Sequence, residues 1–300
     1  MIHPQSIVHP KAKIGKHVRI DAFTTIEEDV VIGDHCSIGS NVTIMNGARI
    51  GNHCQVFHGA IISAPPADLK FDGEKTTAEI GDHTIIREFV SIHKGTQDKM
   101  KTVIGTNCLI MAYCHVAHDC IIGNHCIMSN STQLAGHVTL GDYAIISGMC
   151  GVNQFVRIGD HAYIGAFTMV RKDVPPFVRA GNNPASFSGI NTVGLRRRGY
   201  TSETINQTMD VFRILYNNNL NVSQALEKLE HETPISAIKS TIVAFIRESK
   251  RGIIRRSTKS TSDGCAWHKN IEGGFHCSNC CISCCLLSSK SLPSDYIQNN

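Results

Sequence analysis

Residues 104–170 read IGTNCLIMAYCHVAHDCIIGNHCIMSNSTQLAGHVTLGDYAIISGMCGVNQFVRIGDHAYIGAFTMV, and an apolar side chain occupies every sixth position of this stretch. An α-helix repeats on one face every 3.6 residues and a plain strand every two, so neither structure explains a period of six. A short strand followed by a corner does explain it, and a hexapeptide period predicts a parallel β-helix. The periodic positions are Ile104, Ile110, Val116, Ile122, Met128, Leu134, Leu140, Ile146, Val152, Ile158, Ile164 and Val170.

The same period begins at the first residues of the chain and is interrupted twice, at about 63–78 and at 96–102. Both interruptions are polar and rich in turn-forming residues, so they predict loops that leave the stack. Long loops in a compact domain are usually functional. The period ends at Pro175-Pro176, where proline removes backbone hydrogen-bond donors. We therefore predict a mainly β fold, with a β-helix over 1–176.

The chain changes its pattern twice beyond the β-helix. A connector at 177–199 leads to apolar residues at helical spacing, which predict a small α-helical domain over 200–255. We expect this domain to cap the open end of the stack. From 256–300 neither period continues, and this Ser-, Lys- and Cys-rich tail is predicted to be disordered. The helical spacing rests on Ile205, Met209, Phe212 and Tyr216.

The chain has 13 cysteines, which would suggest a disulfide framework only in a small secreted protein. Seven of them fall four residues after a periodic apolar residue, so we interpret them as small buried hydrophobic side chains. In the tail, two Cys-x2-Cys pairs between Cys277 and Cys284 lie near two histidines, but the pairs abut, which disfavours a zinc module. The seven periodic cysteines are Cys36, Cys54, Cys108, Cys114, Cys120, Cys126 and Cys150.

Composition argues against several classes of function. The formal net charge of +4 is too small to indicate a nucleic-acid-binding protein. The chain has no run of about 18 apolar residues for a membrane span and no apolar segment of a signal peptide at its start. We expect a cytoplasmic protein without stable membrane insertion.

Positions 18 residues apart stack on one another in a β-helix with three hexapeptides per coil. His118 differs from the many other corner histidines because a carboxylate, a second histidine and a glycine amide converge on it. A histidine oriented by a carboxylate suits general-base catalysis near neutral pH. Two neighbouring columns, His118–Gly136–Gln154 and Asp119–His137–Phe155, bring these groups together.

A metal site is the alternative reading of these histidines. A three-histidine metal site of the carbonic-anhydrase type on this fold needs two histidines five residues apart on one coil and a third on a neighbouring coil, between subunits. Residue 123, five positions after His118, is glycine. We therefore predict no metal.

An ordered series of motifs resembles the UDP-N-acetylglucosamine O-acyltransferase family over about residues 1–255. The resemblance implies a left-handed parallel β-helix followed by a small α-helical domain, assembled as a homotrimer with active sites between subunits. The motifs, beside the hexapeptide ladder, are DLKF at 68–71, SIHKGT at 91–96, HVAHDC at 115–120, LAGHV at 134–138, NQF at 153–155 and GINTVGLRRRG at 189–199.

The resemblance implies the first step of lipid A biosynthesis. A 3-hydroxyacyl chain passes from the phosphopantetheine of acyl carrier protein to the 3-hydroxyl of the glucosamine of UDP-N-acetylglucosamine, and no other cofactor is needed. His118 would be the general base, Asp119 would orient it, and the Gly136 backbone N–H would stabilise the oxyanion.

The resemblance also implies the residues that hold the substrates. Three positions depart from the family pattern, namely Asn153 for histidine, Val193 for glutamate and Ala67 for glutamine. None of these departures affects the proposed base or oxyanion donor. The implied substrate-binding residues are Asp68, Lys70, His93, His115, His137, Gln154, Asn191, Arg197 and Arg198, and Ala166 falls at the acyl-length ruler.

Two alternatives stay open. Another hexapeptide acyltransferase would use acetyl-CoA or a different acceptor, and the DLKF loop and the RRRG connector argue against it. A non-catalytic hexapeptide scaffold would not need His118, Asp119, Gly136 and Lys70 together.

Overall fold

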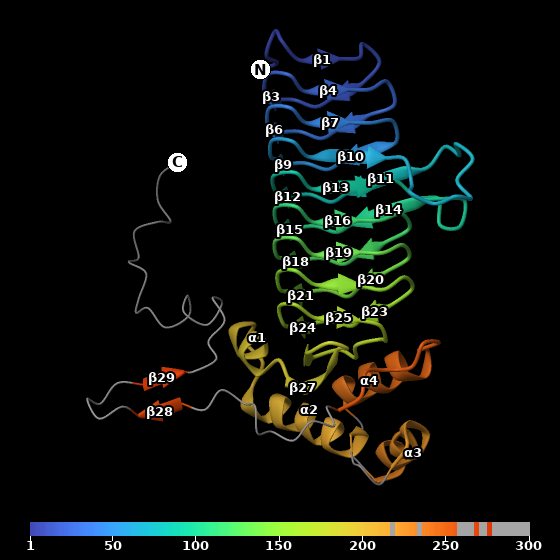
Figure 1. Cartoon of the computed structure of the whole chain (residues 1–300), viewed down its shortest axis with the longest axis vertical. Coiled ribbons are helices and arrows are strands. Elements are labelled where there is room, and N and C mark those ends of the chain that lie inside the picture. The colour runs from blue at the N-terminus through green and yellow to red at the C-terminus, as the bar shows by residue number, and fades with distance from the viewer. Residues whose placement is uncertain (217–219, 233–235, 257–266, 270–274, 278–300) are drawn as a thin grey trace. The chain divides into compact units, whose positions relative to one another are not determined.

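The computed structural model describes residues 1–216, 220–232, 236–256, 267–269 and 275–277. The chain divides into two compact units, Met1–Arg256 and Ser257–Asn300. Within the first unit, short strands stack coil upon coil. The helices lie beyond the last coils, at the C-terminal end of the stack (Figure 1). The fold class predicted from the hexapeptide period is confirmed.

Every third strand belongs to the same sheet, so each coil contributes one strand to each of three parallel sheets. The first sheet contains β1 (Ile7–Val8), β4 (Thr25–Ile26), β7 (Thr43–Ile44), β10 (Ile61–Ala64), β13 (Ser91–His93), β16 (His115–Val116), β19 (Gln133–Leu134), β22 (Gly151–Val152) and β25 (Met169–Val170). The second sheet contains β2 (Lys13–Ile14), β5 (Val31–Ile32), β8 (Ala48–Ile50), β11 (Thr77–Ile80), β14 (Lys101–Ile104), β17 (Ile121–Ile122), β20 (Thr139–Leu140) and β23 (Arg157–Ile158).

The third sheet differs at its end, where β26 and β27 pair antiparallel. Both strands lie in the segment predicted as a connector, so this segment extends the sheet by two strands. The third sheet contains β3 (Arg19–Ile20), β6 (Ser37–Ile38), β9 (Gln55–Val56), β12 (Ile85–Ile86), β15 (Leu109–Ile110), β18 (Ile127–Met128), β21 (Ile145–Ile146), β24 (Tyr163–Ile164), β26 (Val178–Gly181) and β27 (Ser186–Ile190).

The core fills the inside of the coils. The periodic apolar side chains point inward and are buried, while the residue before each of them faces outward, as in His115–Val116. Burying an Ile, Val or Leu side chain contributes about 1.5–3 kcal/mol, so the ladder as a whole stabilises the stack. The seven periodic cysteines are buried and free, which confirms that they behave as small core residues.

Three corners connect the sheets, and we name them by the strands that they join. The first corner follows each strand of the first sheet, the second corner each strand of the second sheet, and the third corner each strand of the third sheet. At most corners the second of the two central residues adopts a positive φ, for example Asp119 at 59°, His137 at 63° and Phe155 at 64° on the first corner. Because every coil turns in the same way, corner residues of successive coils stand above one another.

Two loops leave the stack where the hexapeptide period is interrupted. The first loop connects β10 to β11 and the second connects β13 to β14. Strands β11 and β14 pair in register, with Thr77 opposite Lys101, so the two loops return to the stack side by side (Figure 1).

Four described helices belong to the first unit. They are α1 (Thr192–Arg197), α2 (Ser202–Leu215), α3 (Val222–Glu232) and α4 (Ala237–Arg247). A bridge between Asp173 and Ile253, and a 2.7 Å hydrogen bond from the Ser249 hydroxyl to the Asp173 carboxylate, join the last coil to the segment after α4. No described helix combines the length and apolar character needed to cross a bilayer.

The second unit has two described strands, β28 (Trp267–Lys269) and β29 (Phe275–Cys277), which pair antiparallel. The rest of this segment, including Cys280, Cys281 and Cys284, lies outside the described residues. The prediction of a disordered tail and the weaker zinc hypothesis therefore fall largely on that part of the chain.

Candidate active site

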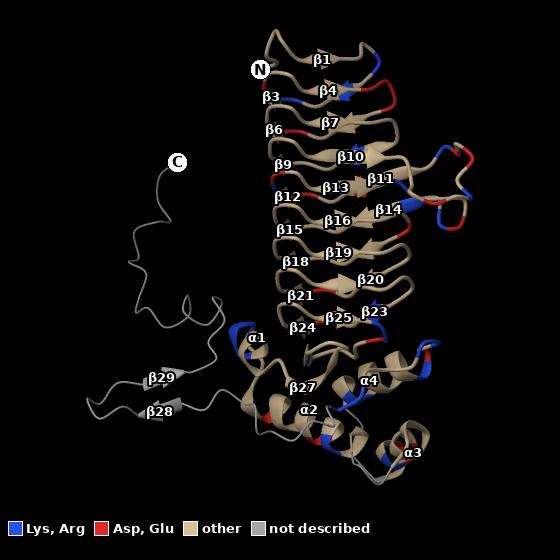
Figure 2. Cartoon of the chain, viewed as in Figure 1, with Lys and Arg blue, Asp and Glu red and all other residues tan. Residues whose placement is uncertain are grey.

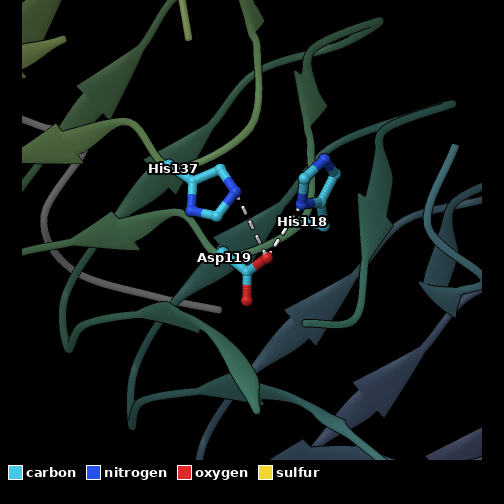
Figure 3. A group of neighbouring side chains, drawn as sticks. All are labelled: His118, Asp119 and His137. Carbon is cyan, nitrogen blue, oxygen red and sulfur yellow. Dashed lines mark hydrogen bonds and ion pairs between the residues drawn. The ribbon is translucent and has the colours of Figure 1, made fainter. Parts of the chain in front are cut away.

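His118 lies on the first corner, two residues after the end of β16, and is 6% exposed. Its Nδ1 lies 2.8 Å from Oδ2 of Asp119 (Figure 3). An ionised carboxylate only accepts hydrogen bonds, so we assign the imidazole proton to Nδ1. Nε2 is then left with a free lone pair, which is the form of histidine that removes a proton from a substrate.

Asp119 is fully buried, and four hydrogen bonds reach its carboxylate. Oδ1 accepts from the backbone N–H of Thr96 at 3.0 Å and of Lys99 at 3.3 Å, and Oδ2 accepts from the Thr96 hydroxyl at 2.6 Å and from His118. Burial alone would raise the pKa of Asp119, but the hydrogen bonds from Thr96 and His118 outweigh it and lower this pKa. The carboxylate is therefore charged at neutral pH.

Gly136 stands one coil beyond His118 in the same column. A Cβ atom at this position would lie 2.7 Å from both Cε1 and Nε2 of His118, so only glycine leaves room for the imidazole. In the part of the chain that the structure describes, the Gly136 N–H donates to no acceptor. On the second corner, by contrast, the amides of Asn124 and Asp142 donate to a carboxylate oxygen of the next coil, at 2.7 and 2.9 Å.

His137 lies against the hydrogen-bonded pair of His118 and Asp119, which we call the dyad. Its ring is perpendicular to that of His118, with centroids 5.1 Å apart, and stacks on Phe155 at 4.4 Å. Nε2 is 3.7 Å from Oδ2 of Asp119 (Figure 3), and Nδ1 is 3.1 Å from Oδ2 of Asp98 without the geometry of a hydrogen bond. Burial lowers the pKa of His137, and the charge of Asp119 opposes this shift only in part.

Two further histidines lie on the first sheet beside the corner. The rings of His93 and His115 meet edge to face at 4.7 Å, and the Ser91 hydroxyl lies 2.8 Å from Nδ1 of His115. Burial, with the nearby histidines, lowers the pKa of His93 to about 4 and lowers that of His115. Both rings are therefore neutral at pH 7, so they act as hydrogen-bonding groups there.

The shifted pKa of His93 has a consequence for stability. The folded protein binds this proton less tightly than the unfolded chain, whose histidine pKa is about 6.5, so His93 contributes stability above pH 6.5 that is lost as pH falls toward 4. We expect urea unfolding to show a smaller loss of stability between pH 7 and pH 4.5 in His93→Gln than in the wild type. His35→Gln, at an exposed corner, should follow the wild type. Parallel pH curves for wild type and His93→Gln would contradict this expectation.

The first loop brings Asp68 to the dyad. Its Oδ2 lies 3.8 Å from Nε2 of His118, and its Oδ1 accepts from the backbone N–H of Lys70 at 3.0 Å. The Lys70 side chain is exposed, and both loops carry cationic and anionic residues away from the stack (Figure 2). Gln154, one coil beyond Gly136, is exposed on the same column.

The other predicted site residues lie on different corners of this chain. Asn191 is buried, caps α1 through Gly194 N–H, and donates to the carbonyl of His161 on the second corner at 2.9 Å. Arg198 donates to the Tyr143 carbonyl at 3.4 Å, also on the second corner. Arg197 is exposed at the end of α1, and Ala166 is half-buried on the third corner. A single chain therefore does not bring these four residues to His118.

The histidines and the carboxylate also have a donor set that a metal ion could use. Donor atoms of His118, Asp119 and His137 all lie within 4.8 Å of one another. The Asp119 carboxylate already accepts four hydrogen bonds, one of them from His118, so the protein itself satisfies it.

A groove of about 320 Å³ between α4 and strands β20 and β23 contains none of the predicted site residues.

Sequence reasoning assigned no role to several residues that contact the site, among them Ser91, Thr96, Asp98 and Lys99. Thr96 and Asp98 belong to the second loop, where no hexapeptide register tells which side chain faces the stack. Ser91 stacks under His115 in register, so the period itself contained the signal for that contact.

Three comparisons with known proteins agree on one family. The model described as "Bacterial transferase hexapeptide (six repeats)" matches residues 11–46 and 101–136, and "Udp N-acetylglucosamine O-acyltransferase; Domain 2" matches 173–254. The acyl-[acyl-carrier-protein]–UDP-N-acetylglucosamine O-acyltransferases of Sulfurihydrogenibium sp. and Aquifex aeolicus are 54% and 56% identical, over 86% and 85% of this chain and 96% and 98% of theirs. The UDP-N-acetylglucosamine acyltransferase structure from Bacteroides fragilis superposes with a TM-score of 0.84 at 49% identity, covering 85% of this chain and all of that one.

The stacked sheets and the buried His118–Asp119 pair thus belong to an acyltransferase of the hexapeptide-repeat class. The agreement extends through the helices after the stack, where the match to the family's second domain ends at residue 254. The chain belongs to the UDP-N-acetylglucosamine O-acyltransferase family. The family predicted from the motifs is confirmed.

Proposed function

We propose that the protein transfers a 3-hydroxyacyl chain from acyl carrier protein to the 3-hydroxyl of the glucosamine of UDP-N-acetylglucosamine, with His118 as general base. This reaction would be the first step of lipid A biosynthesis. The observation that carries the proposal is that the unprotonated Nε2 of His118 lies beside Gly136. Among the described residues, the N–H of Gly136 donates to no acceptor. Acyl transfer needs both a base for the attacking hydroxyl and a donor for the oxyanion.

In this mechanism Nε2 of His118 takes the proton of the sugar 3-hydroxyl as the oxygen attacks the thioester carbonyl carbon. The new C–O bond forms, and the carbonyl oxygen becomes an oxyanion that accepts from the Gly136 N–H. The charge of Asp119 stabilises the imidazolium through Nδ1. The C–S bond then breaks, and the imidazolium returns its proton to the thiolate of the phosphopantetheine. No acyl-enzyme forms.

The surroundings of the dyad suit a polar acceptor. Neutral His93 and His115 offer uncharged hydrogen-bonding nitrogens for sugar hydroxyls, Asp68 lies 3.8 Å from the base, and exposed Lys70 supplies a positive charge for the phosphates. Gln154 and His137 would line the same side.

A homotrimer would complete the site. Asn191, Arg197, Arg198 and Ala166 lie on or beside the second and third corners, whereas His118 lies on the first. Packing of one chain's first corner against another corner of a neighbouring copy would join the two sets. Exposed Arg197 would then face the nucleotide or the acidic carrier protein, where charge complementarity speeds association.

The test is acyl transfer to UDP-N-acetylglucosamine from 3-hydroxyacyl carrier proteins of several chain lengths, with acetyl-CoA as a competing donor. We expect turnover with the carrier-bound donors, one preferred length, and no turnover with acetyl-CoA. Sedimentation analysis should show a trimer. A folded protein that transfers from acetyl-CoA alone, or from no donor, would favour the other hexapeptide acyltransferase or the scaffold.

A further inference from the structure

The second loop is attached to the buried carboxylate of the dyad. Thr96 is itself buried, and it uses both its backbone N–H and its hydroxyl to hold the two oxygens of Asp119, at 3.0 and 2.6 Å. Lys99 adds a backbone N–H to Oδ1 and donates from Nζ to the Asp119 carbonyl at 3.0 Å. On the opposite side, the Asp119 N–H donates to the Thr102 hydroxyl at 2.8 Å.

The Thr96 hydroxyl has a defined direction. A charged carboxylate has no proton to give, so the hydroxyl must donate to Oδ2. The same oxygen accepts from Nδ1 of His118 at 2.8 Å. With two donors of Thr96 on its two oxygens, the carboxylate cannot rotate about its Cβ–Cγ bond without losing both bonds. Its orientation decides which imidazole nitrogen carries the proton.

We propose that Thr96 is a positioning residue of the acyltransferase: it fixes the Asp119 carboxylate so that the proton of His118 stays on Nδ1 and Nε2 stays free. This inference rests on the proposed role of His118 as the base. Among the described residues Thr96 makes no hydrogen bond to His118, and both of its donors reach the Asp119 carboxylate, so its effect on the imidazole passes through Asp119.

The test compares Thr96→Val, which removes the hydroxyl and keeps the backbone N–H, with Thr96→Ser, which restores a hydroxyl. We expect kcat to fall about tenfold in Thr96→Val, as for one lost hydrogen bond to a charged group, with KM for UDP-N-acetylglucosamine within twofold. Thr96→Ser should recover most of kcat. The matched control is Thr76→Val, since the buried Thr76 hydroxyl holds the same loop through the Gly95 carbonyl at 2.6 Å without reaching Asp119.

A second readout does not depend on turnover. The ¹⁵N shifts of selectively labelled histidine distinguish Nδ1–H from Nε2–H. We expect one tautomer of His118 in the wild type and in Thr76→Val, and a mixture in Thr96→Val. A single Nδ1–H tautomer together with unchanged kcat in Thr96→Val would overturn the inference even if His118→Ala is inactive. Absence of transfer by the wild type would count against the proposed function, while the tautomer comparison would still decide the role of Thr96.

Discussion

Replacing His118 by alanine is expected to lower kcat for acyl transfer about 10³-fold, within the usual contribution of a positioned general base. The sugar hydroxyl is a weak nucleophile, and Nε2 of His118 is the basic atom next to the Gly136 amide. Without the imidazole, Asp119 keeps its bonds to Thr96, but no group takes up the proton at the right place. The KM for UDP-N-acetylglucosamine should change little, because the proton is transferred only in the transition state.

His35→Ala is the matched control for this substitution. His35 is also a corner histidine, but it is exposed and stacks on the neighbouring His17 and His53. We expect wild-type kcat from it, and cooperative thermal unfolding from both variants. Activity of His118→Ala within tenfold of the wild type would mean that another group is the base, and His137 would be the next candidate because it also lies beside Asp119.

Gly136→Ala is expected to lower kcat at least about 100-fold. The backbone of Gly136 does not have a positive φ, so an L residue can adopt it, and the effect comes from the methyl group alone. That methyl would lie 2.7 Å from Nε2 of His118 and must push the imidazole aside. Displacing a catalytic group by about 1 Å costs on the order of 10²-fold in rate.

Gly148→Ala provides the control, because Gly148 holds the same first position in a third corner. A Cβ there would have one neighbour, the Asn130 carbonyl oxygen, at 3.2 Å. We expect near-normal kcat in this variant. Both variants should fold, as measured by thermal unfolding and sedimentation. Retention of more than a third of the wild-type kcat in Gly136→Ala would show that the imidazole has another place from which to act.

Much of the site was predictable because the β-helix converts sequence distance into spatial distance. Positions 18 apart occupy the same place in successive coils, so the contact of Gly136 with His118 and the stacking of Phe155 on His137 follow from counting residues. The adjacency of Asp119 to His118 needed no structure at all.

Counting residues does not predict contacts where the hexapeptide period is interrupted. The place of Thr96 depends on how the second loop returns to the stack, and that path is determined by hydrogen bonds to Asp119 rather than by a repeat. The approach of Asp68 to His118 is decided in the same way by the first loop. Asn191 shows a different limit, since its amide is used to cap α1 and to bind the His161 carbonyl.

By itself, the sequence determined the parallel β-helix, the buried ladder, the family and the columns that carry His118 and Gly136, because between the two loops and after them a regular period leaves one register in which the apolar residues are buried. Tertiary structure alone decided which groups hold Asp119. Among the residues that the structure describes, it also left the Gly136 N–H without an acceptor, while the second-corner amides of Asn124 and Asp142 are capped. The contacts of Asp119 with Thr96 and Lys99 join a coil to a loop outside the 18-residue period, so their geometry arises only when the loops and coils pack together.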